Sequence, residues 1–376
     1  ASIVANRNVI FGNGFYSTNL NSGTPNLTYT IGSSASSNAT FSSDPFAGLN
    51  PGGTRLIQLG ATSGAINGTL TFDGAFTTAG SLLVRSGFSG GGEALLTGSS
   101  AVILGNLNFD GSADRTLLVN NASVGGVSFS GATTLGPASG SRTITFNVGS
   151  GSTLNLNGVV QNNGANPGAI NKLGVGTLVL SNANTYSGGT TINAGTIRVT
   201  NASGSGTGGG AVTVGVNGTL AGTGSISGAT TVSGILSPGA GGIGTLSITN
   251  DVTWNAGGAW AFDLGTPGPS IASPGVSDLL LVGGGLIKGT GTTFTFDFQN
   301  TGAAGFYKLI DYNGTTLFDA PAFAATNLPS GLIGVFHVDS GTSAVYVEVG
   351  VPEPATAGLV VLACGAMLRR RRASAI

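Results

Sequence analysis

A rhythm of short apolar runs, separated by Gly, Asn or Ser, restricts the fold of this 376-residue chain more than any other feature. From about residue 54 the runs are three to five residues long, and the triplets Gly-Thr-Leu and Gly-Thr-Ile return repeatedly. A period of about twenty residues fits one coil of a parallel β-solenoid, because two or three short strands and their turns fill it. The triplets begin at Gly68, Gly176, Gly195, Gly218 and Gly244, and a Phe-Asp-Gly fragment begins at Phe72 and again at Phe109.

Composition supports a β-rich fold with a buried core. Gly accounts for 68 residues, and charged side chains make up 7% of the chain, against roughly 25% in ordinary soluble domains. Hydrophobic residues make up 40% and the net charge is −1, which is not the composition of a disordered segment. Gly and Asn suit positive-φ corners, and no long 3.6-residue period is present. We therefore expect an all-β fold, a right-handed parallel β-helix, with a Gly-rich β-sandwich as the alternative.

Changes in residue composition and in the length of the apolar runs divide the chain into four segments. Residues 1–53 would form an N-terminal cap, and residues 54–250 the solenoid. Residues 251–350 carry longer and bulkier strands, which suits a β-rich C-terminal cap over the open end of the solenoid. This cap is either a separate sandwich or a set of widened coils, and Trp254 and Trp260 are interpreted as its core. Residues 351–376 would form a C-terminal tail, with a short hydrophobic helix at residues 355–368.

Several classes of function are disfavoured by the residues that the chain lacks. Apart from four arginines at the C-terminus, the basic residues are scattered singly, so no basic stripe is available for nucleic acid. Cys364 is the single cysteine, which excludes an internal disulfide and a cysteine zinc site. His337 is the single histidine and lies in an alternating run, so we expect it on a strand surface. No metal and no cofactor is expected.

Parallel β-helices also include polysaccharide lyases and hydrolases, which need clustered carboxylates or a basic residue over a groove. The best cluster in this chain is Asp110, Asp114 and Arg115, with Asp73 one or two coils away. The same residues fit an ordinary Asp-Gly turn, which is the preferred interpretation. Calcium binding by these aspartates is a further alternative, although no acidic nonapeptide repeat is present.

Residues 174–201 read GVGTLVLSNANTYSGGTTINAGTIRVTN. This stretch resembles the autotransporter-associated β-strand repeat, also called the passenger-associated transport repeat, of bacterial surface proteins. We expect Leu178 and Leu180 to face one side, and residues 185–189 to turn the chain. Two strands would follow at residues 191–193 and 196–199. Tyr186 is expected to cover the core at a corner, and Asn182 and Asn184 to form Asx-type turns or side-chain ladders. The resemblance implies a β-helical passenger linked to secretion.

The C-terminal residues contain a second recognisable pattern: Val351-Pro352-Glu353-Pro354, an apolar stretch over residues 355–368, and Arg369, Arg370, Arg371 and Arg372. The two prolines keep the motif extended, and the arginines would hold the cytoplasmic end. The pattern resembles the PEP-CTERM protein-sorting signal. That resemblance implies recognition and cleavage by an exosortase, a membrane-embedded enzyme. Cys364 is interpreted as a small hydrophobic residue of the apolar stretch.

The sequence as a whole predicts an exported structural or adhesive protein of the cell surface or extracellular matrix, without catalytic activity. The chain starts at Ala1 without Met, which suggests an export signal already removed. Its Thr, Asn and Ser side chains would bind polysaccharide or pair with other copies into fibres. Membrane contact would come only from the tail, transiently. The alternative is a polysaccharide-active enzyme using Asp110, Asp114 and Arg115.

Overall fold

A computed structural model describes the protein. The backbone alone is described for residues 2–5, 9–11, 27–31, 37–41, 55–59, 68–72, 81–85, 93, 94 and 110. Side chains are also described for residues 95–109, 114–136, 140–299 and 302–352.

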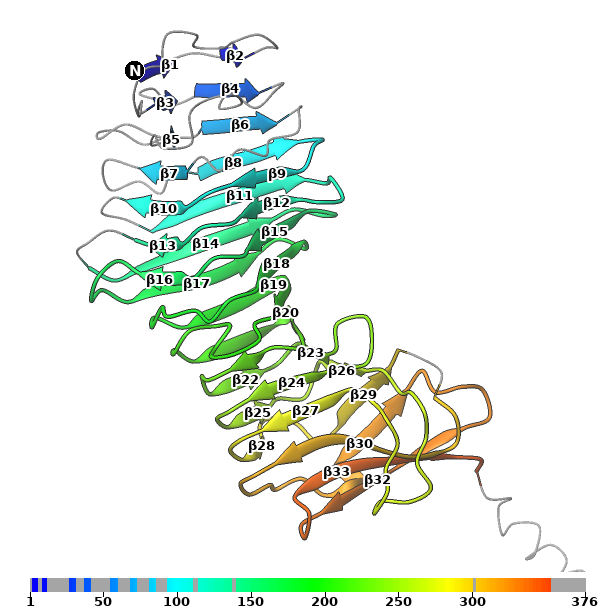
Figure 1. Ribbon diagram of the computed structural model, residues 1–376. Coiled ribbons are helices and arrows are strands. Elements are labelled where there is room, and N and C mark those ends of the chain that lie inside the picture. Colours follow the sequence, from blue (N-terminus) through cyan, green and yellow to red (C-terminus); the bar gives the residue numbers. More distant parts are fainter. Residues whose placement is uncertain are drawn as a thin grey trace, which may run out of the picture.

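The described chain is a stack of coils with three faces (Figure 1). From β7 to β30 the chain visits a third, a first and a second face in a constant order. Most strands pair with the strand one coil before them, and β21 and β26 are the first strands of new sheets. The strands of the first face are β2 (Val9–Phe11), β4 (Ser37–Phe41), β6 (Gly68–Phe72), β8 (Glu93–Gly98), β11 (Arg115–Asn121), β14 (Arg142–Val148), β17 (Gly168–Leu173), β19 (Thr190–Val199), β20 (Val212–Gly222), β22 (Thr230–Val232), β25 (Val252–Trp254) and β28 (Leu286–Lys288).

The second face contains the later halves of β19 and β20, since these two long strands bend from the first face into the second. Its other strands are β9 (Val102–Leu104), β12 (Val127–Phe129), β15 (Thr153–Leu156), β18 (Thr177–Leu180), β23 (Ile235–Pro238), β26 (Ala259–Phe262), β29 (Phe294–Phe298) and β31 (Phe323–Thr326). The single short helix among the described residues is the 3₁₀ turn η1 (Ala320–Ala322).

The third face is interrupted in the middle by two loops that hydrogen-bond from coil to coil. Thr185 N donates to Val160 O (2.8 Å), and Gly206 N donates to Ser225 O (2.8 Å). The strands of this face are β1 (Ser2–Ala5), β3 (Leu27–Ile31), β5 (Arg55–Leu59), β7 (Ser81–Arg85), β10 (Leu107–Asp110), β13 (Thr133–Leu135), β16 (Val160–Asn162), β21 (Ser225–Ile226), β24 (Thr245–Ile248), β27 (Leu279–Val282), β30 (Gly305–Tyr312), β32 (Ile333–Asp339) and β33 (Ala344–Gly350).

Nearly all pairing between the described strands is parallel, which confirms the predicted parallel β-solenoid over the sandwich. Parallel pairing begins with β1 on β3 and continues to β27 on β30 and β29 on β31. It therefore extends beyond the 54–250 segment on both sides, and the bulky strands after residue 250 are widened coils of the same stack. Antiparallel strand pairing is confined to the end, where β33 pairs with β30 and β32 pairs with β33. The tail helix expected within residues 351–376 lies outside the described residues.

The interior is made by the strict alternation of side chains along each strand. In β18 and β29, for example, every second residue is buried and its neighbours are partly exposed. In the wide C-terminal coils aromatic rings fill the interior, and the indoles of Trp254 and Trp260 stack 3.6 Å apart with no exposure. This placement confirms both tryptophans as core residues. The pairing of aliphatic residues with aliphatic residues of the next coil buries apolar area throughout the stack.

The stacking register explains which sequence repeats reflect the coils. Thr177, Thr196 and Thr219 of the Gly-Thr triplets pair directly in successive coils. The triplet at Gly244 does not continue this column, because Thr219 pairs with Ile235 while Thr245 lies on the third face. The Phe-Asp-Gly fragments do not stack either: β6 ends at Phe72 on the first face, and β10 contains Phe109 on the third. Coil length varies, so a repeated fragment of sequence does not by itself show which residues stack.

One pair of neighbouring residues tests the alternation. Leu178 is fully buried and Thr177 points outward in the same strand. Leu178→Ala should lower the free energy of unfolding by about 2–5 kcal/mol, because it removes buried methyl groups and leaves a cavity. The matched control Thr177→Ala should change it by less than about 0.5 kcal/mol. Urea unfolding measures both, and equal losses would contradict the assignment of faces.

Candidate functional site

The most regular surface feature is a column of side chains along the outside of the first face, which we call the first threonine rank. Each member pairs with the corresponding residue of the next coil, and the rank ends where Thr253 pairs with Ile287. Neighbouring strands lie about 4.8 Å apart, so the rank presents one polar side chain at each such step. All members are partly or fully exposed. They are Thr116, Thr145, Asn171, Thr191, Thr213, Thr231 and Thr253.

A second column, the second threonine rank, follows the outside of the second face. It consists of Thr153, Thr177, Thr196 and Thr219, which pair in consecutive coils and are partly exposed. Ile235 pairs with Thr219 and ends the rank. The Thr- and Asn-lined faces expected from the sequence are therefore present as two columns of residues that pair from coil to coil. It was the coil register that the sequence did not reveal.

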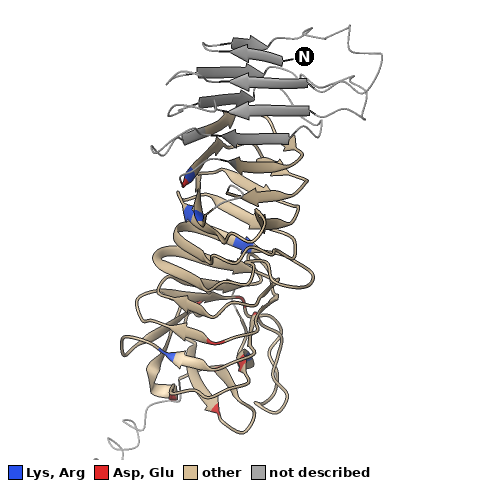
Figure 2. Ribbon diagram, turned by 90° about the vertical axis from the view of Figure 1, so that its left-hand side faces the viewer, with Lys and Arg blue, Asp and Glu red and all other residues tan. Residues whose placement is uncertain are grey.

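The hydroxyls of these ranks are available to solvent. Within the described residues, Thr145 alone of the rank threonines has a hydrogen-bonded hydroxyl, which accepts from Asn171 Nδ2 at 3.2 Å. Asn171 Oδ1 in turn accepts from Asn193 Nδ2 at 2.8 Å. Charged side chains are sparse along the solenoid (Figure 2), and Arg198 is the exposed charge nearest in sequence to the second rank. The ranks can thus donate and accept hydrogen bonds, and their own side chains carry no charge that would favour a charged ligand.

Inside the first face, one charged residue interrupts the apolar column. Lys172 pairs with Phe146 and Ile192 and has no exposed surface. Its Nζ donates to the carbonyl oxygens of Leu173 (2.7 Å), Gly174 (2.7 Å) and Ala194 (3.2 Å) at the corner between the first and second faces. Burial lowers the pKa of Lys172 to about 8. A lone lysine in a strand gives no local sign of pointing inward, so the inward position of Lys172 was not predicted from the sequence.

The same corner explains a glycine of the repeat. Gly195 has a φ of 66°, in the left-handed region that favours glycine. A side chain there would collide with the carbonyl oxygens of Gly174 and Gly176. The chain does not break at this corner: the two strands expected at residues 191–193 and 196–199 form one strand, β19, with a register irregularity between Ile192 and Ala194.

Residues 181–189 form the third-face loop of the repeat and contribute to the core. Asn184 is buried; its Oδ1 accepts from Val160 N (2.7 Å) and its Nδ2 donates to Gly206 O (2.5 Å), which joins three coils. Asn182 Oδ1 accepts from Ala183 N (2.8 Å). Tyr186 has no exposed surface, and its hydroxyl contacts Thr190 Oγ1 at 2.6 Å. Tyr186 is therefore a core residue, as predicted.

The candidate catalytic cluster is described only for Asp114 and Arg115. Arg115 is 2% exposed, and its Nη1 donates to Asp114 O at 2.7 Å. Asp114 is exposed, and its carboxylate accepts from Thr143 N at 2.8 Å. A hollow of about 420 Å³ beside it is lined by Arg142, not Arg115. The side chains of Asp110 and Asp73 lie outside the described residues. Residues 111–113 of the predicted turn also lie outside the described residues.

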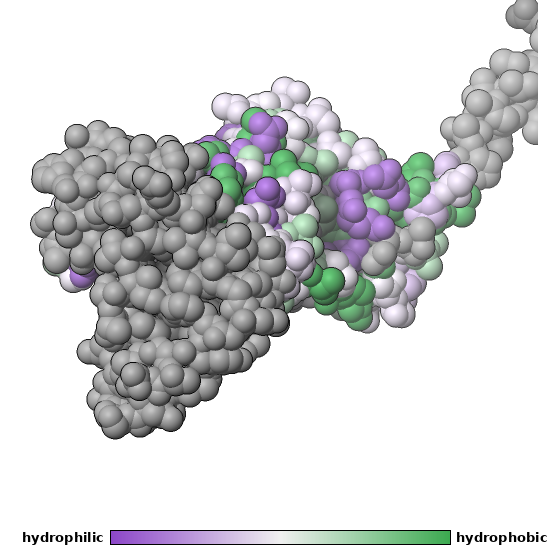
Figure 3. Space-filling view, turned by 90° about the horizontal axis from the view of Figure 1, so that it is seen from above, coloured by the Kyte–Doolittle hydropathy of each residue, from purple (hydrophilic) through white to green (hydrophobic). Residues whose placement is uncertain are grey.

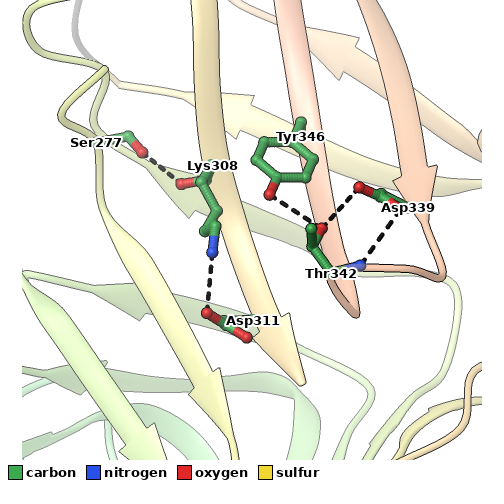
Figure 4. Close-up of polar contacts among 6 residues, drawn as sticks. All are labelled: Ser277, Lys308, Asp311, Asp339, Thr342 and Tyr346. Atoms are coloured by element: carbon green, nitrogen blue, oxygen red, sulfur yellow. Dashed lines mark hydrogen bonds and ion pairs between the residues drawn. The ribbon is translucent and has the colours of Figure 1, made fainter. Parts of the chain in front are cut away.

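A second hollow of about 520 Å³ lies between β24, β27, β30 and the β32–β33 turn. The polar side chains near it satisfy one another (Figure 4). Lys308 Nζ lies 3.0 Å from Asp311 Oδ2, and Thr342 Oγ1 donates to Asp339 Oδ2 at 2.8 Å. Burial opposes the charge of Lys308, but the hydrogen bond and charge of Asp311 outweigh it and raise the pKa of Lys308. These contacts fix the end of the sheet and leave no unpaired base or nucleophile among the residues drawn.

Asp263 and Asp278 form a buried acidic pair at the base of an excursion between β26 and β27. The Asp278 carboxylate accepts from Gly244 N (2.8 Å) and Asp263 N (2.9 Å). Burial raises the pKa of Asp278 to about 7, and the charge of Asp263 adds to the rise. Because both oxygens hold backbone groups, Asp278 ties the excursion to the neighbouring loop. Among the described residues no group of three or more His, Cys, Asp or Glu side chains could hold a metal ion.

The other predicted residues are placed only in part. His337 lies on the outer side of β32, and its Nε2 is 3.2 Å from Glu348 Oε2, so the predicted strand-surface position is confirmed. Val351 and Pro352 are exposed. Glu353, Pro354, Cys364 and residues 369–372 lie outside the described residues. In the part of the chain that the structure describes, no helix has the length and apolar character needed to cross a membrane.

Lys172 gives a pH-dependence that can be measured. An unfolded lysine keeps its proton to about pH 10, whereas Lys172 in the folded protein releases it near pH 8, so the folded state binds fewer protons between these values. The free energy of unfolding should therefore rise with pH over this window. Urea unfolding at several pH values should show this slope.

The matched variants separate Lys172 from the other lysines. Lys172→Met should remove the slope, and Lys288→Met, a change in the wide coils that leaves Lys172 intact, should retain it. A slope that persists in Lys172→Met would contradict the assignment.

Comparison with known proteins identifies one segment. The family model of the passenger-associated transport repeat matches residues 170–199. The match spans most of β17, then β18, the loop with Asn184 and Tyr186, and β19, and so confirms the resemblance drawn from the sequence. A search of curated proteins found no match. In this repeat the chain is similar to surface-associated proteins of the autotransporter type.

Proposed function

We propose that this chain is an exported structural or adhesive protein of the bacterial surface or extracellular matrix, and that it works without catalysis. The repeat match and the parallel solenoid support a surface-associated protein. The low content of charged residues lets many copies lie close together without strong repulsion.

The observation that carries the proposal is the pair of threonine ranks. A threonine hydroxyl both donates and accepts hydrogen bonds, and its methyl group offers a small apolar contact. The regular repetition suits a long polymer whose own hydroxyls repeat, because many weak contacts in series give strong total binding. The ranks have no net charge to select an acidic polymer. The proposed ligand is therefore a neutral polysaccharide, and lateral pairing of copies is the competing use of the same surface.

The C-terminal residues supply the proposed route to the surface. Val351 and Pro352 follow the last strand and are exposed. This exposure suits recognition of an extended Val-Pro-Glu-Pro segment. In this proposal an exosortase binds Val351 to Pro354 and cleaves near them. The apolar stretch and Arg369 to Arg372 hold the chain at the inner membrane until cleavage. These roles rest on the resemblance to the sorting signal.

The rank hypothesis predicts a specific loss of binding. Thr191→Lys, Thr213→Lys and Thr231→Lys together should weaken binding to a neutral β-glucan by at least about tenfold, because bulky charges replace hydroxyls in three consecutive coils. Binding is measured by co-sedimentation with the insoluble glucan. An equal number of lysines at exposed threonines away from the ranks, Thr223, Thr249 and Thr315, serves as the control.

The control protein should bind like the unmodified protein. Equal losses in both triple variants would show a general charge effect and count against the ranks. Unchanged binding in the rank variant, or tighter binding to an acidic polysaccharide than to the neutral one, would also contradict the proposal.

The sorting hypothesis predicts a change of mass. Protein recovered from the cell surface should lack residues 355–376 by mass spectrometry, because cleavage near the Pro-Glu-Pro segment removes them. Glu353→Ala with Pro354→Ala should leave the tail attached and the protein in the membrane fraction. Surface protein that retains the tail would contradict sorting, whereas the binding result above would stand.

A further inference from the structure

The edge strand of the third face, β32, has a neighbouring strand on one side only. The six-stranded sheet ends in β32, which pairs antiparallel with β33 at the C-terminal end of the stack (Figure 1). Every second residue of such a strand directs its N–H and C=O away from its partner. Within the described residues, the backbone of Ile333–Asp339 forms no hydrogen bond other than those with β33. This edge therefore offers a row of free donors and acceptors.

The side chains of β32 do not protect the edge. Natural edge strands are usually guarded by Lys, Pro or a β-bulge, or by being very short. This strand has seven residues, contains neither Lys nor Pro, and pairs without a register shift from Ile333 to Asp339. Ile333 and Val335 are 45% and 46% exposed on its outer side. Seen from above, the described part of the surface mixes hydrophobic and hydrophilic residues (Figure 3).

The charged groups of the strand are occupied within the same hairpin. His337 faces Glu348 of β33, and the Asp339 carboxylate accepts from Gly341 N (2.8 Å) and from the hydroxyl of Thr342. Hydrogen bonding by Thr342 and Gly341 lowers the pKa of Asp339. An approaching strand would thus meet free backbone groups and exposed aliphatic side chains, without an unpaired charge that must be desolvated.

We propose that this edge is an interaction site for a second copy of the chain, with β32 paired antiparallel to β32 of the partner. An antiparallel pair of identical strands has two-fold symmetry, so each copy supplies the same edge and the contact closes as a dimer. Pairing gives the free backbone groups of both strands hydrogen-bond partners. It also brings Ile333 and Val335 of the two copies together at the contact. Because β32 ends the stack, the dimer is two rods joined at their C-terminal ends, with one sheet continuous across the joint.

This site is separate from the threonine ranks, and so it goes beyond the proposed function and does not depend on it. A single strand pair is a small interface, and small interfaces give weak, concentration-dependent association. The dimer is therefore expected to form at the high local concentration of a surface layer. There it would be about twice as long as a single rod.

The test uses the full chain in sedimentation velocity and small-angle X-ray scattering across a concentration series. The unmodified protein should form a dimer whose maximum dimension is about twice that of the monomer. Ile333→Lys with Val335→Lys should weaken dimerisation at least about tenfold, because lysines on an edge strand oppose strand addition. Val124→Lys with Val216→Lys, at exposed valines on the solenoid corner, is the matched control and should dimerise normally.

Glucan binding and the near-UV circular dichroism spectrum should be unchanged in the edge variant, which shows that it is folded and that its ranks are intact. A monomer at every concentration would overturn the proposal. So would a dimer that survives the edge substitutions, that is lost equally in the control, or whose maximum dimension does not increase.

Discussion

Backbone hydrogen bonding between successive coils is the constraint on which the rest of this structure depends. Most strands satisfy their peptide groups with the coil before and the coil after them, so the fold needs few charged contacts and tolerates a surface of Ser, Thr and Asn. The same requirement extends to irregular segments. Where the third face has no strand, Thr185 and Gly206 donate to Val160 and Ser225 across the coils, and the buried Asn184 side chain supplies further links.

A register fixed in this way converts a loose sequence repeat into ordered columns. Inward positions stack aliphatic and aromatic residues into one continuous core, and outward positions stack threonines into ranks with the spacing of the strands. Lys172 shows that the rule is strong enough to hold a charged residue inside, provided that its ammonium reaches the carbonyl groups at the corner. At the last coil the ladder stops, and β32 is left with an unused edge.

The sequence predicted the parallel solenoid, the inward leucines of the repeat, the buried Tyr186 and the core position of both tryptophans, because alternation and turn residues are local signals. It did not predict which repeats stack, since coil length varies and register is set by partners in other coils. For this reason the Gly244 triplet and the Phe-Asp-Gly fragments repeat in the sequence but do not stack in the structure. The inward lysine, the buried Arg115 and the threonine ranks also depend on long-range register, which local patterns do not contain.

Distances along the first rank test the stacking most directly. In a chain with Cys364→Ser, spin labels would be placed at Thr116 and, in separate samples, at Thr213, Thr231 or Thr253. Double electron–electron resonance should show the mean distance increasing by about 4.8 Å for each coil added, since one strand separates successive members. Distances that do not increase in this order, or that increase by irregular steps, would contradict a single stack of parallel coils.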